Sequence, residues 1–249
     1  KPIIVGVDGS PESARAAALG AWIAERTSAP CRLVHAASDY WSTLAVPEVA
    51  VDLTQLDNAA RVAARRLVDH SLENAVPLAL RRNVDITILL FNNRIYGLTK
   101  GQYSPTSELG KVTKSTPLGS VDQPFNPLSI AIGAEATFVA RAIDTDKQGS
   151  LEVLRAAAQH RGAAFVEILQ NCNIYNDGAF DVVRDDKDNR LYLRAGEEVR
   201  WGDKGVRMRS DGTLEIVDAS AGGLLRHDPL RDDPGLAFAL ARLTWESSG

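Results

Sequence analysis

The strongest constraint on the fold is an alternation of strands and helices at the start of the chain. Residues 1–8 form a β-branched apolar run, which is typical of a strand buried on both faces of a parallel sheet. Ser10 and Pro11 then suit the cap and first turn of an alanine-rich helix. A second strand over 31–37 and a helix over 53–72 complete a β-α-β-α unit. This order implies parallel strands joined by right-handed crossovers, and hence an α/β fold.

The remaining chain continues this alternation and then changes character. We expect further strands over 84–91, 137–142 and 163–169, and helices over 128–136 and 150–159. The later sequence is charged and rich in Gly and Asp, which indicates a small irregular β region near 181–225. Its short strands should include 191–193 and 213–217. We expect a last helix over 234–243, with Asp232 or Asp233 as its cap.

Composition excludes several classes of protein. The net charge of -4 is evenly spread, because residues 1–80 carry 7 basic and 9 acidic residues and residues 81–249 carry 21 and 23. This balance argues against a nucleic-acid partner. No apolar run reaches the roughly 18–20 residues of a membrane span, so we expect no membrane partner. With only Cys31 and Cys172 and no visible export signal, we expect a cytoplasmic location.

The first strand reads Ile3-Ile4-Val5-Gly6-Val7-Asp8-Gly9-Ser10, and the second contains Leu33-Val34-His35-Ala36. Together with the intervening helix, these residues resemble the universal stress protein family over residues 1–77. The resemblance implies an adenine-nucleotide site, with ATP as the ligand. Asp8 would contact the nucleoside, and the backbone of Ala36 would contact adenine. Asp8 also follows a parallel strand, at the edge where open α/β sheets bind ligands.

The phosphate-binding part of that family is missing. It is a Gly-x-x-Gly loop followed by Gly-Ser or Gly-Thr, which holds phosphates at a helix N-terminus. Gly110 with Gly119-Ser120 imitates it only in part, because the spacing differs and the first pair of glycines is absent. Asp8 therefore has two alternative roles, a nucleotide contact or a cap for the following turn.

Three blocks carry a second resemblance. They are Asn92-Asn93-Arg94-Ile95-Tyr96-Gly97-Leu98-Thr99-Lys100-Gly101-Gln102, Gly133-Ala134-Glu135-Ala136-Thr137-Phe138-Val139-Ala140-Arg141, and Val166-Glu167-Ile168-Leu169-Gln170-Asn171-Cys172. Residues 79–249 resemble the β subunit of the 2-oxoacid:ferredoxin oxidoreductases, most of all the 2-oxoglutarate type. The resemblance implies a parallel-sheet three-layer sandwich that binds thiamine diphosphate. It also implies oxidative decarboxylation, with an α subunit as partner, ferredoxin as electron acceptor and coenzyme A as acyl acceptor.

The first of these blocks contains the candidate cofactor residues. Mg²⁺ bound to a diphosphate prefers about six oxygen ligands. The resemblance makes the Asn93 amide oxygen and the Ile95 carbonyl oxygen two of them, with Thr99 close to the diphosphate. Lys100 would attract the distal carboxylate of a 2-oxoacid, although a solvated loop lysine is the alternative. We assign no catalytic side chain, because the cofactor itself supplies the reactive carbon.

Two family features are absent from the sequence. The diphosphate motif Gly-Asp-Gly, which supplies an Mg²⁺ aspartate, has no counterpart, and Asp69 is merely an acid in the matching region. The family's [4Fe-4S] cluster needs four cysteines. Cys172 matches one of them and Cys31 matches none. An inert buried thiol is the alternative for Cys172.

The two resemblances meet near residues 77–80, which predicts segments over 1–78 and 79–249. A natural or engineered gene fusion, a wrongly assembled sequence, and a deliberate chimera would each explain this junction. The functional alternatives are a β subunit or an incomplete derivative of one, an adenine-nucleotide-binding protein, and an inactive fold chimera.

Overall fold

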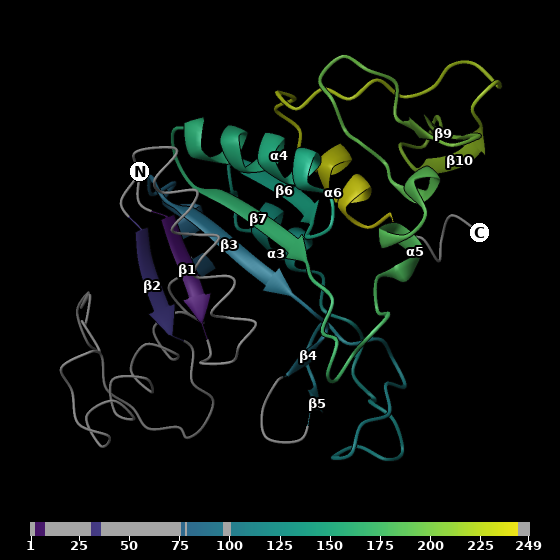
Figure 1. Ribbon diagram of the computed structural model, residues 1–249. Coiled ribbons are helices and arrows are strands. Elements are labelled where there is room, and N and C mark those ends of the chain that lie inside the picture. Colours follow the sequence, from purple (N-terminus) through teal and green to yellow (C-terminus); the bar gives the residue numbers. More distant parts are fainter. Residues whose placement is uncertain (1–2, 8–30, 36–75, 78, 97–100, 244–249) are drawn as a thin grey trace. The chain divides into compact units, whose positions relative to one another are not determined.

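The computed structural model describes residues 3–7, 31–35, 76–77, 79–96 and 101–243 (Figure 1). The chain divides into two compact units, Lys1–Asp177 and Gly178–Gly249. Each unit has its own sheet and its own apolar core. None of the helices in the described ranges combines the length and the apolar character needed to cross a bilayer.

A five-stranded parallel sheet forms the centre of the first unit, with strand order β2-β1-β3-β7-β6. The strands are β1 Ile3–Val7, β2 Cys31–His35, β3 Thr87–Asn92, β6 Phe138–Ile143 and β7 Ala164–Leu169. Each lies within or overlaps a strand expected from the sequence. The predicted parallel α/β class is therefore confirmed.

The N-terminal strands belong to the same sheet as the later ones. Ile3 of β1 pairs with Cys31 on one side and with Thr87 of β3 on the other. The helices expected after Ser10 and over 53–72 lie outside the described residues. The predicted division of the chain at residue 78 falls in the connection between β2 and β3, and it stays a prediction.

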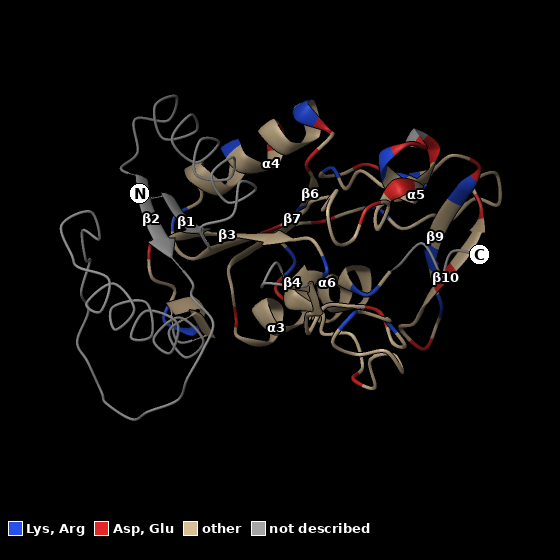
Figure 2. Cartoon of the chain, turned by 60° about the horizontal axis from the view of Figure 1, so that its bottom comes forward, with Lys and Arg blue, Asp and Glu red and all other residues tan. Residues whose placement is uncertain are grey.

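Two helices cover opposite faces of this sheet. They are α3, Pro127–Gly133, and α4, Lys147–Gln159. The connection from β3 to β6 skips the position of β7 and runs toward the β6 edge of the sheet. The connection from β6 to β7 runs one position back, away from that edge. Right-handed crossovers in opposite directions place their helices on opposite faces, and the two views show α3 and α4 on the two sides of the sheet (Figures 1 and 2). The result is the expected three-layer arrangement.

Strand β7 is buried along its whole length. Its Val166 and Ile168 pack in one core cluster with Leu154 and Ala157 of α4. Alternate residues of a strand face opposite sides of the sheet, so Glu167 points away from this cluster. A carboxylate in the centre of the sheet must find polar partners there.

The long polar stretch after β3 is folded rather than featureless. Strand β4, Ile95–Tyr96, pairs antiparallel with β5, Gln102–Tyr103. Further along, the Gly110 N–H donates to the Ser120 carbonyl at 2.8 Å, and the Ser120 N–H donates to the Lys111 carbonyl at 3.0 Å. These bonds close a hairpin-like turn beside the end of the sheet.

The second unit contains a three-stranded antiparallel sheet, in the order β10-β9-β8. Its elements are α5 Asp181–Arg184, a 3₁₀ turn Lys187–Asn189, β8 Arg200–Trp201, β9 Lys204–Met208, β10 Leu214–Asp218 and α6 Gly235–Ala241. Val199, Val206, Leu236 and Leu240 form its core. The small β region expected near 181–225 is confirmed.

Two local predictions for this unit were wrong. Residues 191–193 are not a strand, because an alternating pattern needs a partner strand to become part of a sheet. The last helix is capped by Pro234 rather than by an aspartate. Asp233 still assists, since its Oδ1 accepts the Gly235 N–H at 3.0 Å.

Candidate functional site

The candidate site is the turn that follows β3, at the carboxyl edge of the parallel sheet. Two successive asparagines shape it. Asn92 Oδ1 accepts the Arg94 N–H at 3.1 Å, and Asn93 Oδ1 accepts the Ile95 N–H at 3.2 Å. Arg94 takes the left-handed conformation, with φ 56°, which local asparagine bonds of this kind help to stabilise. The chain therefore reverses within a few residues at the edge where such sheets bind ligands.

Glu167 fixes the start of this turn from the neighbouring strand. The Asn92 Nδ2 donates to Glu167 Oε1 at 2.7 Å, and the Arg141 Nε donates to Glu167 Oε2 at 2.8 Å. Glu167 is 1% exposed, so its two oxygens depend on these partners rather than on water for hydrogen bonds. Sequence analysis identified none of this network, although the charged residue within an apolar strand run was its visible signal.

The 104–107 segment contacts the turn from the other side. The Thr106 Oγ1 donates to Asn92 Oδ1 at 2.7 Å, and the Ser107 Oγ donates to the Arg94 carbonyl at 2.6 Å. The Ser104 N–H donates to Ser107 Oγ at 2.9 Å, so the hydroxyl of Ser107 both accepts and donates. Ser104 and Ser107 are buried. Short hydroxyl side chains thus satisfy backbone groups that water cannot reach.

Asn176, in the loop after β7, completes the surroundings of the turn. Its Nδ2 donates to the carbonyls of Asn93 at 2.9 Å and Arg94 at 3.5 Å, and its Oδ1 accepts from Lys111 Nζ at 2.5 Å. Lys111 also forms an ion pair with Glu108 at 2.8 Å. Burial opposes ionisation of Glu108, but the hydrogen bond and charge of Lys111 prevail and lower the pKa of that carboxyl.

The two predicted Mg²⁺ ligands lie in this turn. The Ile95 side chain is a buried hydrocarbon, 4% exposed, so this residue could bind a metal only through its backbone carbonyl. Both ligands are neutral oxygens, and the described residues contain no cluster of three or more His, Cys, Asp or Glu side chains suited to a metal. Such a donor set fits Mg²⁺ that takes its anionic oxygens from a bound diphosphate rather than from a protein cage.

Several predicted site residues cannot be placed. Thr99, Lys100, Asp8 and Ala36 lie outside the described residues, as does Asp69. Asp8 and Ala36 directly follow Val7 and His35, and those two strand ends pair with each other. The predicted roles of all four site residues stay predictions.

The two cysteines lie at opposite ends of strands in the parallel sheet. Cys172 is a free, buried thiol, 4% exposed, that follows the carboxyl end of β7 and forms a backbone bridge with Asn176. Cys31 begins β2. Because the five strands of this sheet are parallel, Cys31 lies at its amino edge and Cys172 beyond its carboxyl edge. Both interpretations of Cys172, a cluster ligand and an inert buried thiol, stay predictions.

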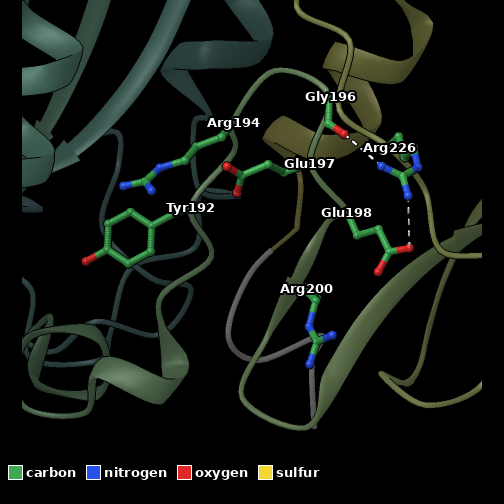
Figure 3. Close-up of a pocket in the computed structure, with 7 residues that line it drawn as sticks. All are labelled: Tyr192, Arg194, Gly196, Glu197, Glu198, Arg200 and Arg226. Carbon is green, nitrogen blue, oxygen red and sulfur yellow. Dashed lines mark hydrogen bonds and ion pairs between the residues drawn. The ribbon is translucent and has the colours of Figure 1, made fainter.

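The second unit has a shallow cavity of about 610 Å³. Its lining residues are Tyr192, Arg194, Gly196, Glu197, Glu198, Arg200 and Arg226 (Figure 3). Arg226 donates to the Gly196 carbonyl at 3.0 Å and forms an ion pair with Glu198 at 3.6 Å. Opposite charges are interleaved around the cavity, so its lining has no patch of a single charge. None of the predicted site residues lines it.

Comparison with known proteins confirms both resemblances. Residues 71–168 match the family described as thiamine pyrophosphate enzyme, C-terminal TPP binding domain. Residues 1–84 match the universal stress protein family. The two matches overlap over residues 71–84, which is where the sequence places the junction.

The thiamine-enzyme match extends to individual relatives. The chain is 59% identical over 173 residues to the 2-oxoglutarate oxidoreductase subunit KorB of Mycobacterium tuberculosis, covering 67% of this chain and 46% of that protein. It is 46% identical over 97 residues to the 2-oxoacid:ferredoxin oxidoreductase subunit beta of Saccharolobus solfataricus, covering 39% and 32%. A solved 2-oxoglutarate:ferredoxin oxidoreductase from Magnetococcus marinus is 26% identical, with a TM-score of 0.46, over 71% of this chain and 56% of that one. The chain thus spans less than half the length of the two curated relatives.

Proposed function

We propose, on the premise that residues 71–168 match a thiamine-diphosphate-binding domain, that this chain is a β subunit of 2-oxoacid:ferredoxin oxidoreductase type, or an incomplete derivative of one. The reaction is the oxidative decarboxylation of a 2-oxoacid, with electrons passing to ferredoxin and the acyl group to coenzyme A. The 59% identity to a 2-oxoglutarate oxidoreductase subunit favours 2-oxoglutarate. That identity is the observation that carries the proposal.

The residues of the turn after β3 would bind and orient the cofactor. The Asn93 amide oxygen and the Ile95 carbonyl would hold Mg²⁺, Thr99 would lie close to the diphosphate, and Lys100 would attract the distal carboxylate of the 2-oxoacid. When bound, thiamine diphosphate supplies the nucleophilic carbon and the electron sink. The buried network around Asn92 would keep these ligands in place.

An α subunit is the partner that this proposal requires. The segment beside the turn exposes large apolar side chains, including Leu118 at 99% and Val121 at 85%. Apolar groups gathered on one stretch of surface are typical of protein interfaces. Electron transfer to ferredoxin would need a [4Fe-4S] cluster with four cysteine ligands, and this chain has two cysteines, so we expect cofactor binding without complete turnover by this chain alone.

Isothermal calorimetry with the full chain tests the proposal. Thiamine diphosphate should bind with a measurable heat when Mg²⁺ is present, and excess chelator should abolish that heat. An Asn93→Ala variant should bind more weakly, because it lacks the side-chain metal ligand. No heat at millimolar cofactor and Mg²⁺ would rule out an intact site.

A second candidate function is adenine-nucleotide binding by the N-terminal segment. The match of residues 1–84 to the universal stress protein family favours it, as does the pairing of Val7 with His35 directly before Asp8 and Ala36. Saturating ATP should then protect amides of residues 1–40 from hydrogen exchange. If neither ATP nor thiamine diphosphate binds, the inactive fold chimera is the remaining alternative, since β1 and β2 extend the sheet of β3.

A further inference from the structure

Asn176 is buried, whereas the three residues before it in the loop after β7 are exposed. It is 5% exposed, and its single amide nitrogen reaches two carbonyls, those of Asn93 at 2.9 Å and Arg94 at 3.5 Å. These carbonyls belong to the two peptide units that connect Asn93 to Ile95. Each peptide unit is planar, so fixing both carbonyls fixes the direction of the chain between the two predicted metal ligands.

Lys111 determines which way the Asn176 amide points. An ammonium group can only donate hydrogen bonds, so the oxygen of the amide must face Lys111 Nζ, at 2.5 Å. The Nδ2 is thereby directed at the carbonyls of the turn. Glu108 holds the ammonium in place through its own ion pair at 2.8 Å. A chain of polar contacts therefore runs from the 108–111 segment through Asn176 to the turn.

We infer that Asn176 is a positioning residue for the Mg²⁺-binding turn, and that Lys111 orients it for this role. The inference rests on the proposed function, since it concerns how that site is held. As a positioning residue, Asn176 would act through the turn, without contacting the cofactor or the substrate. It sets the orientation of the two peptide units through which the Asn93 side chain and the Ile95 carbonyl approach one metal ion. Partners of this kind tune metal sites strongly.

Asn176→Asp isolates the proposed contact. The carboxylate can still accept from Lys111, but it cannot donate, and it places negative oxygens against the two carbonyls. Asn173→Asp is the matched control, because Asn173 lies in the same loop, is exposed, and undergoes the same change of charge. In the protein without cofactor, hydrogen exchange of the Arg94 and Ile95 amides should accelerate by about tenfold in Asn176→Asp and remain unchanged in the control.

Calorimetry of the full chain supplies the second measurement. Asn176→Asp should bind thiamine diphosphate about tenfold more weakly than the wild type at a limiting Mg²⁺ concentration. Raising Mg²⁺ should restore most of the affinity by mass action, which a general loss of structure would not allow. Asn173→Asp should match the wild type throughout.

The outcomes separate this inference from the proposed function. If the wild type binds thiamine diphosphate and the affinity of Asn176→Asp lies within twofold of the wild-type value, the positioning role is overturned. Unchanged exchange at Arg94 and Ile95 would overturn it independently, without any cofactor. A wild type that fails to bind would overturn the proposed function, and the exchange measurement alone would then decide whether Asn176 holds the turn.

Discussion

Asn92 and Glu167 lie on adjacent parallel strands and are joined by a hydrogen bond of 2.7 Å from Nδ2 to Oε1. The second carboxylate oxygen of Glu167 is bound to Arg141 at 2.8 Å. Glu167 is almost fully buried, whereas the side chain of Arg141 is 31% exposed. The carboxylate is thus the member of this network that depends most on its partners, and it connects the core of the sheet to the start of the candidate site.

Replacing Glu167 by Gln should destabilise the first unit. Asn92 and Arg141 bond different oxygens of Glu167, and in Gln one of those oxygens becomes an NH₂ group, so one donor loses its acceptor, at a cost of about 1–3 kcal/mol. The partial exposure of Arg141 keeps the loss below that of a fully buried ion pair. Urea unfolding, followed by circular dichroism, measures the change. Glu135→Gln is the control, because Glu135 is exposed, and equal midpoints for the two variants would refute the role given to Glu167.

The proposed Mg²⁺ site can be tested by replacing its single side-chain ligand, Asn93, in two ways. Asn93→Ala removes Oδ1, which is both the proposed metal ligand and the acceptor of the Ile95 N–H, so Mg²⁺-dependent binding of thiamine diphosphate should fall by at least tenfold. Asn93→Asp keeps an oxygen at this position and adds the negative charge that the missing Gly-Asp-Gly would have supplied. It should therefore bind at least as tightly as the wild type. Calorimetry measures both, and equal affinity of Asn93→Ala and wild type would contradict the assignment.

The sequence predicted the residues of the turn but not the side chains that hold it, because those side chains are far away along the chain. The strand β3 and the asparagine turn are local features, visible as an apolar run that ends at Asn92. The partners of the turn are not local, since Glu167 is 75 positions from Asn92 and Asn176 is 83 positions from Asn93. No periodicity or propensity reports a contact of that separation. The strand predicted over 191–193 was wrong for a similar reason, because strand formation depends on a partner that the local pattern does not reveal.

The stability of the second unit should depend on pH through His227. Burial lowers the pKa of this imidazole, against a smaller opposing effect of Asp228. A histidine with a lowered folded-state pKa binds protons more readily when unfolded, so protonation favours unfolding. Above the ordinary pKa of 6.5 both states are neutral and His227 has no effect. As the pH falls below that value, stability should decrease until the folded state is protonated as well.

Thermal unfolding of wild type and His227→Gln between pH 7.5 and 5.5 measures this dependence. The variant should lose part of the decrease seen in the wild type. Carboxylates of the same unit, such as Glu215 between Arg207 and Arg209, have lowered pKa values. Their contribution is lost only at more acidic pH, below the ordinary value of 4.5, so the two windows are separable. Identical pH profiles of the variant and the wild type would contradict the prediction.

Gly101 should tolerate no side chain, for two separable reasons. Its φ of +67° is a left-handed conformation, and a Cβ atom would lie 2.6 Å from Cδ1 and 3.1 Å from Cβ of Tyr175. The close approach includes the base of the tyrosine side chain, so a change of rotamer alone does not relieve it. Gly101→Ala should therefore destabilise the loop that contains Asn176 by about 2–4 kcal/mol, as the sum of backbone strain and overpacking.

Gly110→Ala separates the two contributions. Gly110 has a φ of +79° and no atom within 4 Å of an added Cβ, so this variant carries the backbone strain alone, about 1 kcal/mol. Urea unfolding should show the larger loss for Gly101→Ala, and Tyr175→Ala in the same chain should reduce the difference between the two glycine variants. If the two alanine variants unfold at the same midpoint, the contact with Tyr175 does not constrain Gly101. The loop would then owe its position to Asn176 and its partners alone.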